Sequence, residues 1–594
     1  MKSGERTTRA QRFAWLLVPL FAFLAVHPLV VHGCSCGHDF EFHLESWLDA
    51  AQQMRHGTLY PQWAFTAAWN AGEPRFVFYP PLSWMLGALL TRLLPLNAVP
   101  IVFTWLALTG AGLSMFFLAR RFTSAPAALL ASAIYLANPY ILFTGFERTA
   151  YAELLAAAWM PLVVMAALNA RARLASIAIP LALLWLTNAP AAVIGSYGFA
   201  LIVALSMLTR WHHTRSQPDR TKPLVGRALL AATGAITGIL LAGFYLVPAA
   251  YEQLWVQIAM ATLPNMRVED SFLFGHTSDA GHNMVLHTAS MIAIVLLVAT
   301  AFALAAAWQR TSREPSERTQ PTLIVLALVT AIIAFLLTPP SLFIWHLLPK
   351  LAFLQFPWRL LSLEGVMLGL AVVLALPRNK LSIRSAALLG ILFALGMSAA
   401  ANHLYRQSCD TDDLPSARAA LLASHHGMQP TDEYTPRTAD NDALRTTNPA
   451  YWLAGDLNDA NAPAPGTQPN PVQADPNFDP NDLDDAQTVS ANAPLHLNLH
   501  LSKPQALILN LRDYPAWEVT FTAPGQAQPQ HPAHLQRDDG LLAIALPAGD
   551  STIDVHWHHT QDHNLGLALS VAGVAILGFG SGLGTWRSRR GRVA

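Results

Sequence analysis

The chain has 594 residues, of which 53% are hydrophobic and only 12% are charged. A soluble domain carries about 25% charged residues, so this chain cannot cover its surface with charge, and lipid must cover much of it. Its 37 basic and 37 acidic residues balance. This balance offers no basic surface for a nucleic acid, and the composition predicts a membrane protein.

Hydrophobic segments long enough to cross a bilayer core of about 30 Å recur along the chain. About twelve spans are predicted, at 13–31, 99–119, 125–144, 154–170, 174–188, 191–209, 228–249, 286–308, 322–346, 360–377, 383–401 and 565–584. A shorter apolar piece, 82–95, contains Arg92 and is predicted to lie at the membrane surface or to re-enter it. Counts from about eleven to thirteen stay open.

Clusters of basic residues fall at alternate ends of these spans. They occur at 2–12, at 120–121, at 210–222 and at 587–592. Because short cytoplasmic loops carry the excess of Lys and Arg, both termini are predicted to be cytoplasmic. Residues 32–98 then form a long extracytoplasmic loop.

Residues 402–563 break the hydrophobic pattern. Much of 402–494 is rich in Asp, Asn, Pro and Ala, a composition that cannot bury a core and predicts an extracytoplasmic linker. Alternating segments at 495–501, 506–511, 517–523, 540–546 and 552–557 follow. They predict a small extracytoplasmic domain over 495–563 that resembles a β-sandwich. A final span and a basic cytoplasmic tail occupy 564–594.

Ionisable residues concentrate in the predicted outer loops, where a charge beside the bilayer is costly and marks a candidate site. Asp39 precedes a helix predicted over 40–56, so it is either that helix's N-cap or a reactive group. His43 lies one turn along, on the same side of the helix. The later outer loops add further candidates, namely Glu147, Arg148, Glu153, Lys350 and Arg359.

The segment HGCSCGHDFEFH (32–43) leaves the state of its cysteines open. Cys34 and Cys36 could be free thiols, a strained disulfide with each other, or metal ligands with His38 and His43. Lipid attachment at Cys34 would need small residues before it, where the chain has a bulky His. The segment DPNFDPNDLDD (475–485) loosely resembles a calcium loop but lacks the required Gly.

Four segments in combination resemble a known family. They are GHDFEFHLESWLDAAQQMRHGTLYPQW (37–63), NAGEPRFVFYPPLSW (70–84), YLVPAAYEQ (245–253) and LQFPWRLL (354–361). Over about residues 1–400 the chain resembles bacterial membrane proteins with a 6-pyruvoyl-tetrahydropterin synthase-related domain. That family is similar in layout to the GT-C glycosyltransferases, multispan enzymes that use polyprenyl-phosphate sugars on the outer membrane face.

The resemblance implies a GT-C-like transmembrane domain over 1–401 in a bacterial inner membrane. It implies the lipid bilayer and a polyprenyl-phosphate sugar donor as partners, and an acceptor that is an unknown glycan, lipid or protein. Asp39 matches the acidic residue of the first outer loop, and Glu147 or Glu153 could supply a second acid. No Asp-x-Asp occurs in that loop. No cofactor is specified, and a divalent metal is possible.

The implied chemistry assigns roles to the other candidates. A desolvated carboxylate has a raised pKa and can accept the proton of the acceptor, while the departing phosphate gains charge and needs a cation. Arg359, at the start of a span, is favoured as the cation that binds the departing phosphate, because a guanidinium holds phosphate bidentately. Arg148 and Lys350 are alternatives. Arg359 could instead be an interfacial anchor. Tyr79, Trp63 and Trp84 are either stacking platforms for a sugar or prenyl chain, or members of the interfacial aromatic belt.

Two other functions stay open. A transporter or lipid flippase would have charges and broken helices near the bilayer midplane and internal repeats. No clear repeat is present, and Asn188 in TNAP (187–190) is the main feature in its favour. A non-catalytic envelope assembly protein would bind a partner through its strand domain, and Asp39 and Arg359 would be dispensable.

Overall fold

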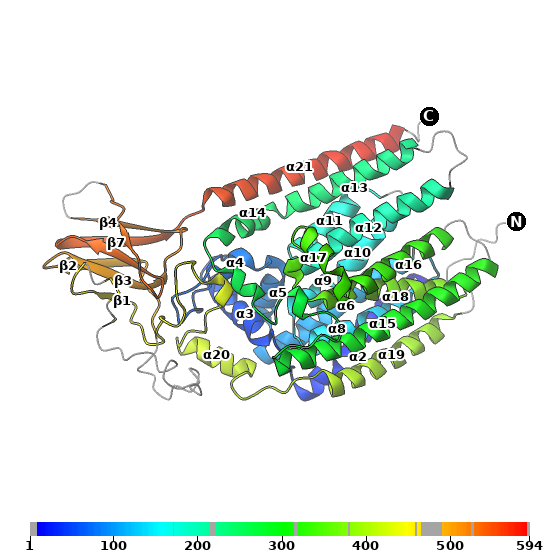
Figure 1. Cartoon of the computed structure of the whole chain (residues 1–594), viewed down its shortest axis with the longest axis horizontal. Helices are drawn as coiled ribbons and strands as arrows, with labels where there is room; N and C mark the ends of the chain where they lie inside the picture. Colours follow the sequence, from blue (N-terminus) through cyan, green and yellow to red (C-terminus); the bar gives the residue numbers. More distant parts are fainter. Residues whose placement is uncertain are drawn as a thin grey trace.

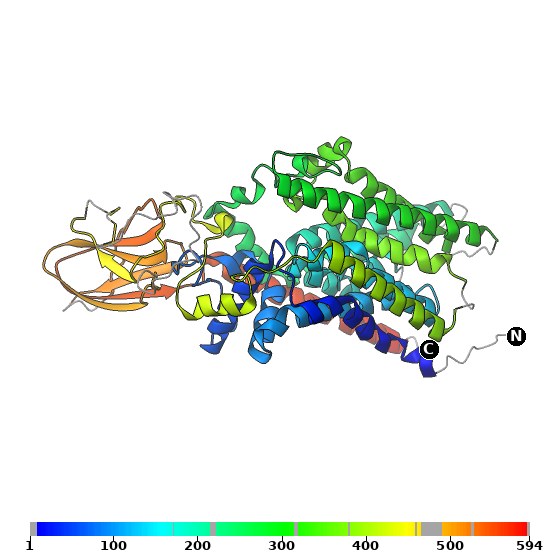
Figure 2. The same ribbon diagram turned by 90° about the horizontal axis from the view of Figure 1, so that it is seen from below.

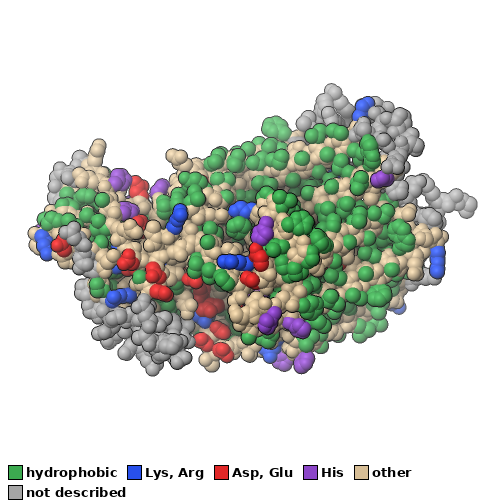
Figure 3. Space-filling view, viewed as in Figure 1, with side chains coloured by type: hydrophobic (Ala, Val, Ile, Leu, Met, Phe, Trp, Pro, Cys, Tyr) green, Lys and Arg blue, Asp and Glu red, His purple; other side chains and the backbone are tan. Residues whose placement is uncertain are grey.

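The computed structural model describes residues 9–169, 172–213, 221–313, 319–377, 381–457, 460–461, 463–464, 490–523 and 528–590. A bundle of long helices is joined at one end to a small β domain, and the other end of the bundle carries both chain termini (Figure 1; Figure 2). Hydrophobic side chains cover the bundle, whereas acidic side chains gather where the bundle meets the β domain (Figure 3).

Within the described residues, ten helices are long and apolar enough to cross a membrane, which defines a multi-pass membrane protein. They are α2 (Val18–His32), α6 (Val99–Ala119), α9 (Tyr151–Ala156) with α10 (Met160–Leu168), α12 (Ala189–His213), α13 (Thr221–Leu241), α15 (Ala280–Arg313), α16 (Thr319–Leu336), α18 (Leu361–Ala375), α19 (Ile383–Leu404) and α21 (Gln561–Arg590). An eleventh span is formed if α7 (Ala125–Leu136) and α8 (Pro139–Phe146), bent by 41°, count as one.

Most predicted spans coincide with these helices, but their count differs from the prediction, and the span predicted at 322–346 is divided between α16 and α17 (Leu342–Leu347). The span predicted at 174–188 is α11 (Leu174–Trp185), whose 12 residues are too few to cross a bilayer alone. The span predicted at 228–249 is divided between α13 and α14 (Gly243–Tyr251). The segment at 82–95 is α5 (Pro81–Leu93), which is not among the candidate spans.

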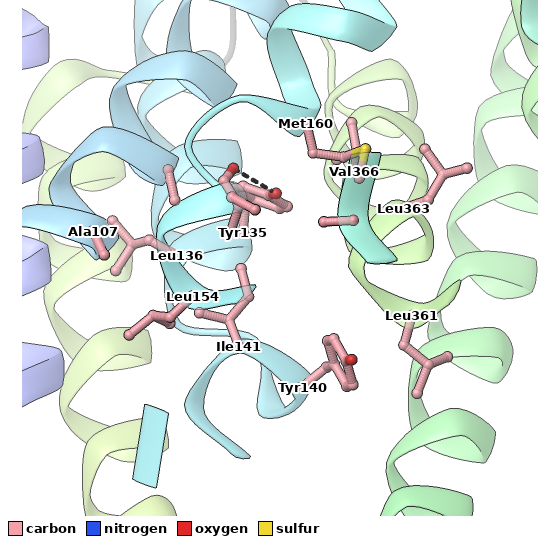
Figure 4. Close-up of a cluster of buried hydrophobic side chains, with 14 of the residues drawn as sticks. Ala107, Tyr135, Leu136, Tyr140, Ile141, Leu154, Met160, Leu361, Leu363 and Val366 are labelled. Atoms are coloured by element: carbon pink, nitrogen blue, oxygen red, sulfur yellow. Dashed lines mark hydrogen bonds between the residues drawn. The ribbon is translucent and has the colours of Figure 1, made fainter. Parts of the chain in front are cut away.

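The loop between α2 and α6 contains α3 (Phe40–Arg55), α4 (Arg75–Phe78) and α5. The α3 helix forms because apolar residues recur at helical spacing, and Phe40, Leu44 and Trp47 are fully buried. Apolar side chains of α7 to α10 pack against α18 in one buried cluster, to which Tyr140 also belongs (Figure 4). This packing brings the end of α8 and the starts of α9 and α18 close to the start of α3.

The β domain has two antiparallel sheets. One has the order β1 (Tyr451–Leu453), β3 (Gln505–Arg512), β6 (Leu541–Leu546), β5 (His534–Leu535). The other has the order β2 (His496–Leu501), β7 (Gly549–Trp557), β4 (Trp517–Thr522). All five predicted strands are therefore confirmed, and β1 and β5 were not predicted.

The linker predicted over 402–494 is structured in much of its described part, which corrects that prediction. It contains α20 (Pro415–Ala423) and the edge strand β1. Leu444 and Trp452 give it an apolar anchor, because both are buried against the β domain. The calcium-like segment 475–485 lies outside the described residues.

The β domain is fixed to the bundle through the first loop. Trp63 contacts the rings of Tyr514, Trp517 and Trp557 and is buried. The burial of Trp63 excludes it as a stacking platform for a substrate. Its ring instead holds the loop that carries α3 against the β sheets.

Candidate active site

The backbone around Asp39 is held against the loop that follows α8. The Asp39 amide donates to the Arg148 carbonyl at 3.0 Å. A Cβ atom on Gly37 would lie 1.9 Å from the Glu147 carbonyl oxygen, so only glycine allows the two loops to approach this closely. Two segments more than a hundred residues apart thereby place Asp39 beside Arg148.

Asp39 occupies the N-cap position of α3, as predicted, but its side chain makes no capping hydrogen bond, so capping is not what this side chain does. Its Oδ2 lies 3.9 Å from Nη2 of Arg148, and 44% of its side chain is exposed. The prediction of a desolvated carboxylate is therefore also wrong for Asp39. The side chain is an accessible acid whose charge is balanced by one nearby guanidinium.

Arg148 also pairs with Glu153, and this second pair is buried. Nη1 of Arg148 lies 2.7 Å from Oε2 of Glu153. The Tyr140 hydroxyl donates to Oε1 of the same carboxylate. Both oxygens of Glu153 are thus engaged, which makes Glu153 a fixed counter-charge rather than a free base.

Arg359 reaches the same carboxylate from the other side of the site. Its Nε lies 3.4 Å from Oε2 of Glu153, and its Nη1 donates to the Leu354 carbonyl at 2.8 Å. The guanidinium also lies 5.0 Å from the ring centroid of Phe356. Arg359 therefore points into the protein and is not an interfacial anchor.

His43 lies one turn along α3 from Asp39, and its ring contacts the ring of Tyr79. Nε2 of His43 lies 3.5 Å from the Tyr79 hydroxyl, and His43 is 1% exposed. Burial lowers the pKa of His43 to about 4, against the opposing effect of Asp39. Burial and then Asp39 raise the pKa of Tyr79. At neutral pH both side chains are uncharged hydrogen-bonding groups.

Three predicted site residues are not brought into this cluster. Glu147 accepts a hydrogen bond from Gln407 at 2.6 Å, and burial raises its pKa. Lys350 is exposed, and its Nζ lies 4.4 Å from the centroid of the Phe353 ring. Trp84 is fully buried against Phe76, so it is not a substrate platform.

The opposite face of α3 carries an ion network of its own. Arg75 contacts Glu73 at 2.7 Å and Glu45 at 3.7 Å. Arg418 of α20 contacts Glu41 at 2.5 Å. These ion pairs fix one face of α3, and the opposite face, which carries Asp39 and His43, belongs to the candidate site.

The cysteines form a pair that the sequence did not indicate. Cys36 is disulfide-bonded to Cys409, and Cys34 is a buried free thiol. The Cys34–Cys36 disulfide and the metal site of Cys34, Cys36, His38 and His43 are therefore both excluded. The disulfide ties the segment before Asp39 to the chain that follows α19.

Among the described residues, two groups of three donor side chains come together closely enough to hold a metal. One is the cysteine cluster, in which the Cys36–Cys409 disulfide leaves only the Cys34 thiol as a ligand, and the other is Glu252, Asp562 and His563. Neither includes Asp39. Among the described residues, those at the candidate site therefore do not form a three-donor metal-binding set.

The cluster consists of Asp39, His43, Tyr79, Tyr140, Arg148, Glu153 and Arg359. Tyr140 and the counter-charge role of Glu153 were missed, because no local signal in PYILFTGF marks a hydroxyl that meets a carboxylate thirteen residues later. No protein-family model matches this chain, and no match was found among proteins of curated function.

Gly37→Ala is expected to displace the Asp39 loop. The added methyl group would overlap backbone atoms of Glu147, which cannot rotate away. We expect lower thermal stability in detergent and loss of function, whereas Gly455→Ala, at a loop glycine with open space at its Cβ position, is the matched control and should behave as wild type. A Gly37→Ala protein with wild-type stability and function would contradict the close approach.

Acid is expected to destabilise the protein through His43. The unfolded chain binds a proton at His43 below about pH 6.5, whereas the folded chain does so only near pH 4. Stability is therefore lost as pH falls from about 6.5 towards 4, by at most about 3 kcal/mol. Thermal unfolding across this range should be less acid-sensitive for His43→Gln, and an unchanged pH profile would contradict a neutral buried His43.

Proposed function

We propose that the protein is a glycosyltransferase of the bacterial inner membrane that uses a polyprenyl-phosphate-linked sugar. Its extracytoplasmic face would be the end with the β domain, both termini would be cytoplasmic, and its products would be modified cell-envelope glycans or glycolipids. The single observation that carries the proposal is the accessible Asp39 carboxylate beside the Arg148 and Arg359 guanidinium groups, which share the buried Glu153.

In this reaction Asp39 is the general base. Its carboxylate is exposed enough to meet an acceptor hydroxyl and can take the proton as the oxygen attacks the anomeric carbon. One direct displacement inverts that carbon and needs no covalent enzyme intermediate. The half-buried Tyr79, whose hydroxyl lies next to the buried His43, supplies a neutral hydrogen-bonding group that can orient the sugar.

The two arginines stabilise the departing polyprenyl phosphate. Arg148 and Arg359 together carry two positive charges, which the shared Glu153 and the Asp39 carboxylate beside Arg148 balance. When Asp39 takes the proton of the acceptor, one positive charge becomes available to the phosphate, whose negative charge grows as the glycosidic bond breaks. Glu153 is a positioning residue, since it fixes both guanidinium groups without facing the acceptor.

One observation favours transport as a second candidate. Glu364 of α18 is fully buried in a candidate span, accepts a hydrogen bond from Thr330 of α16 at 3.3 Å, and leaves Oε2 without a partner. Acids within spans often mark ion pathways. Transport through this site predicts that Glu364→Gln, rather than Asp39→Asn, abolishes function.

Binding of the lipid phosphate tests the enzyme proposal directly. Arg359→Gln is expected to weaken binding of a polyprenyl phosphate to the purified protein about tenfold or more, because a charge-assisted contact contributes about 1.5–3 kcal/mol. Microscale thermophoresis in detergent would measure the affinity. Arg267→Gln, at an exposed arginine whose Nε donates to a loop carbonyl, is the matched control. Equal affinities of Arg359→Gln and wild type would contradict the proposal.

A further inference from the structure

Gln355 has a strained backbone conformation. Its φ of 60° and ψ of −52°, together with a 2.6 Å hydrogen bond from the Phe356 amide to the Leu354 carbonyl, define a γ-turn centred on Gln355. This form of the γ-turn is rare and strained, and strained backbone persists only where the surrounding contacts enforce it. Such strain gathers at functional sites, and this turn lies four residues before Arg359 of the candidate site.

The side chain of Gln355 joins two segments that are far apart in the sequence. Its Nε2 donates to the carbonyl of Ala261 in the short helix η4 (Ile258–Thr262). Its Oε1 accepts a hydrogen bond from Nη1 of Arg359 at 3.3 Å. The amide thus uses its donor on one side and its acceptor on the other. A glutamate would place an oxygen against the Ala261 carbonyl, so the arrangement fits a glutamine and not a glutamate.

The segment that carries Ala261 is itself held in place. Nε2 of Gln257, just before η4, donates to the carbonyls of Pro436 and Ala439 at 3.1 and 2.6 Å. Both acceptors belong to the chain between α20 and β1, which packs against the β domain. The Ala261 carbonyl is therefore part of a braced loop, and Gln355 is held between that loop and the Arg359 guanidinium.

These contacts engage one side of the Arg359 guanidinium. Nη1 donates to the Leu354 carbonyl at 2.8 Å and to Oε1 of Gln355, while Nε lies 3.4 Å from Oε2 of Glu153. Nη2 donates no hydrogen bond within the described part of the chain, and unlike Nε it is not a fully buried atom. The γ-turn aims the Leu354 carbonyl at the guanidinium, the Gln355 amide supplies a second acceptor, and Nη2 is left to meet a ligand.

We propose that Gln355 is a positioning residue for phosphate binding by Arg359, an inference that rests on the proposed function. Its uncharged oxygen holds Nη1 without neutralising the guanidinium, and so keeps Nη2 turned towards the phosphate of the polyprenyl donor. A carboxylate at position 355 would pair with the guanidinium and compete with the phosphate. Because the side chain acts through Arg359, its replacement changes phosphate binding only while that arginine is present.

A double-mutant cycle of Gln355→Gly and Arg359→Gln, made in the full-length protein, tests the proposal. Glycine adopts a positive φ without steric cost, so Gln355→Gly keeps the turn and removes only the amide. The affinity for a polyprenyl phosphate, measured by microscale thermophoresis in detergent, should fall about fivefold for Gln355→Gly. It should fall no further when Gln355→Gly is added to Arg359→Gln. Gln355→Glu is expected to weaken binding more than Gln355→Gly, because its carboxylate neutralises Arg359.

His425→Gly is the matched control, because His425 is an exposed residue that also has a positive φ, of 59°. Its affinity for the polyprenyl phosphate should equal that of wild type. Weaker binding by Arg359→Gln together with unchanged binding by Gln355→Gly would overturn the positioning role and leave the enzyme proposal standing. An equal loss from Gln355→Gly with and without Arg359 would overturn it as well, since the effect would then be a general structural one.

Unchanged binding by Arg359→Gln would contradict the enzyme proposal, and the positioning role is then decided without the lipid. The same cycle is measured on the thermal unfolding midpoints of the lipid-free protein in detergent. Because the two side chains share a hydrogen bond, their effects on the midpoint should not be additive. Additive shifts would overturn the positioning role whatever the function of the protein.

Discussion

Asp39→Asn is expected to lower glycosyl transfer by about 10²- to 10⁴-fold, the range that a general base contributes. The amide keeps the size of the side chain but cannot take the proton of the acceptor. Because the side chain is half-exposed and caps no helix, folding should be unaffected. Surface glycan or glycolipid composition of the native host, complemented with the variant, would report the loss.

The control for Asp39→Asn is Asp412→Asn. Asp412 is an exposed acid just before α20, and its replacement should leave the glycan profile unchanged. Both proteins must be present in the membrane at wild-type level. An unchanged profile for Asp39→Asn would remove Asp39 as the base and favour the non-catalytic assembly protein, for which this acid is dispensable.

Glu153→Gln is expected to give the largest loss of stability at the site. The variant leaves Arg148 and Arg359 close together without their shared counter-charge, and breaking a buried ion pair costs about 3–5 kcal/mol. The lost stability comes from the unpaired buried charge, because a Gln side chain can still accept the hydrogen bond of the Tyr140 hydroxyl. Thermal unfolding of the purified protein in detergent should show a clearly lower midpoint.

Glu41→Gln is the comparison for this variant. Glu41 also pairs with an arginine, Arg418, but 45% of its side chain is exposed. Arg418 itself is buried, but it keeps Asp413 and Glu45 as counter-charges when Glu41 is neutralised, so the midpoint should change little. Midpoints that fall equally for Glu41→Gln and Glu153→Gln would show that burial of the Glu153 pair has no special energetic role.

Several site residues could be predicted singly from the sequence. Asp39 and Arg359 stand out because charged groups beside an apolar span are costly, and His43 follows Asp39 by one helical turn. Their separate roles could not be predicted. The sequence could not distinguish Glu147 from Glu153. The direction of the chain after α8 decides between them: Glu147 meets Gln407, whereas Glu153 meets Arg148.

In the β domain too, some features could be predicted from the sequence and others could not. Its five main strands follow from alternation, because a period of two gives one buried face. The edge strand β1 lies in a segment whose overall composition predicts a linker, and Trp452 anchors it only because a sheet edge is available nearby. The Cys36–Cys409 disulfide likewise joins residues 373 positions apart, a distance over which spacing carries no information.

The sequence alone determined the membrane-spanning character, the position of most helices and the main strands of the β domain. These follow from hydrophobic length and periodicity, which are local properties of the chain. The tertiary structure decided which charges meet, which acid is exposed and which is buried as a counter-charge. These depend on distances between remote segments, and such distances are set by packing rather than by any local pattern.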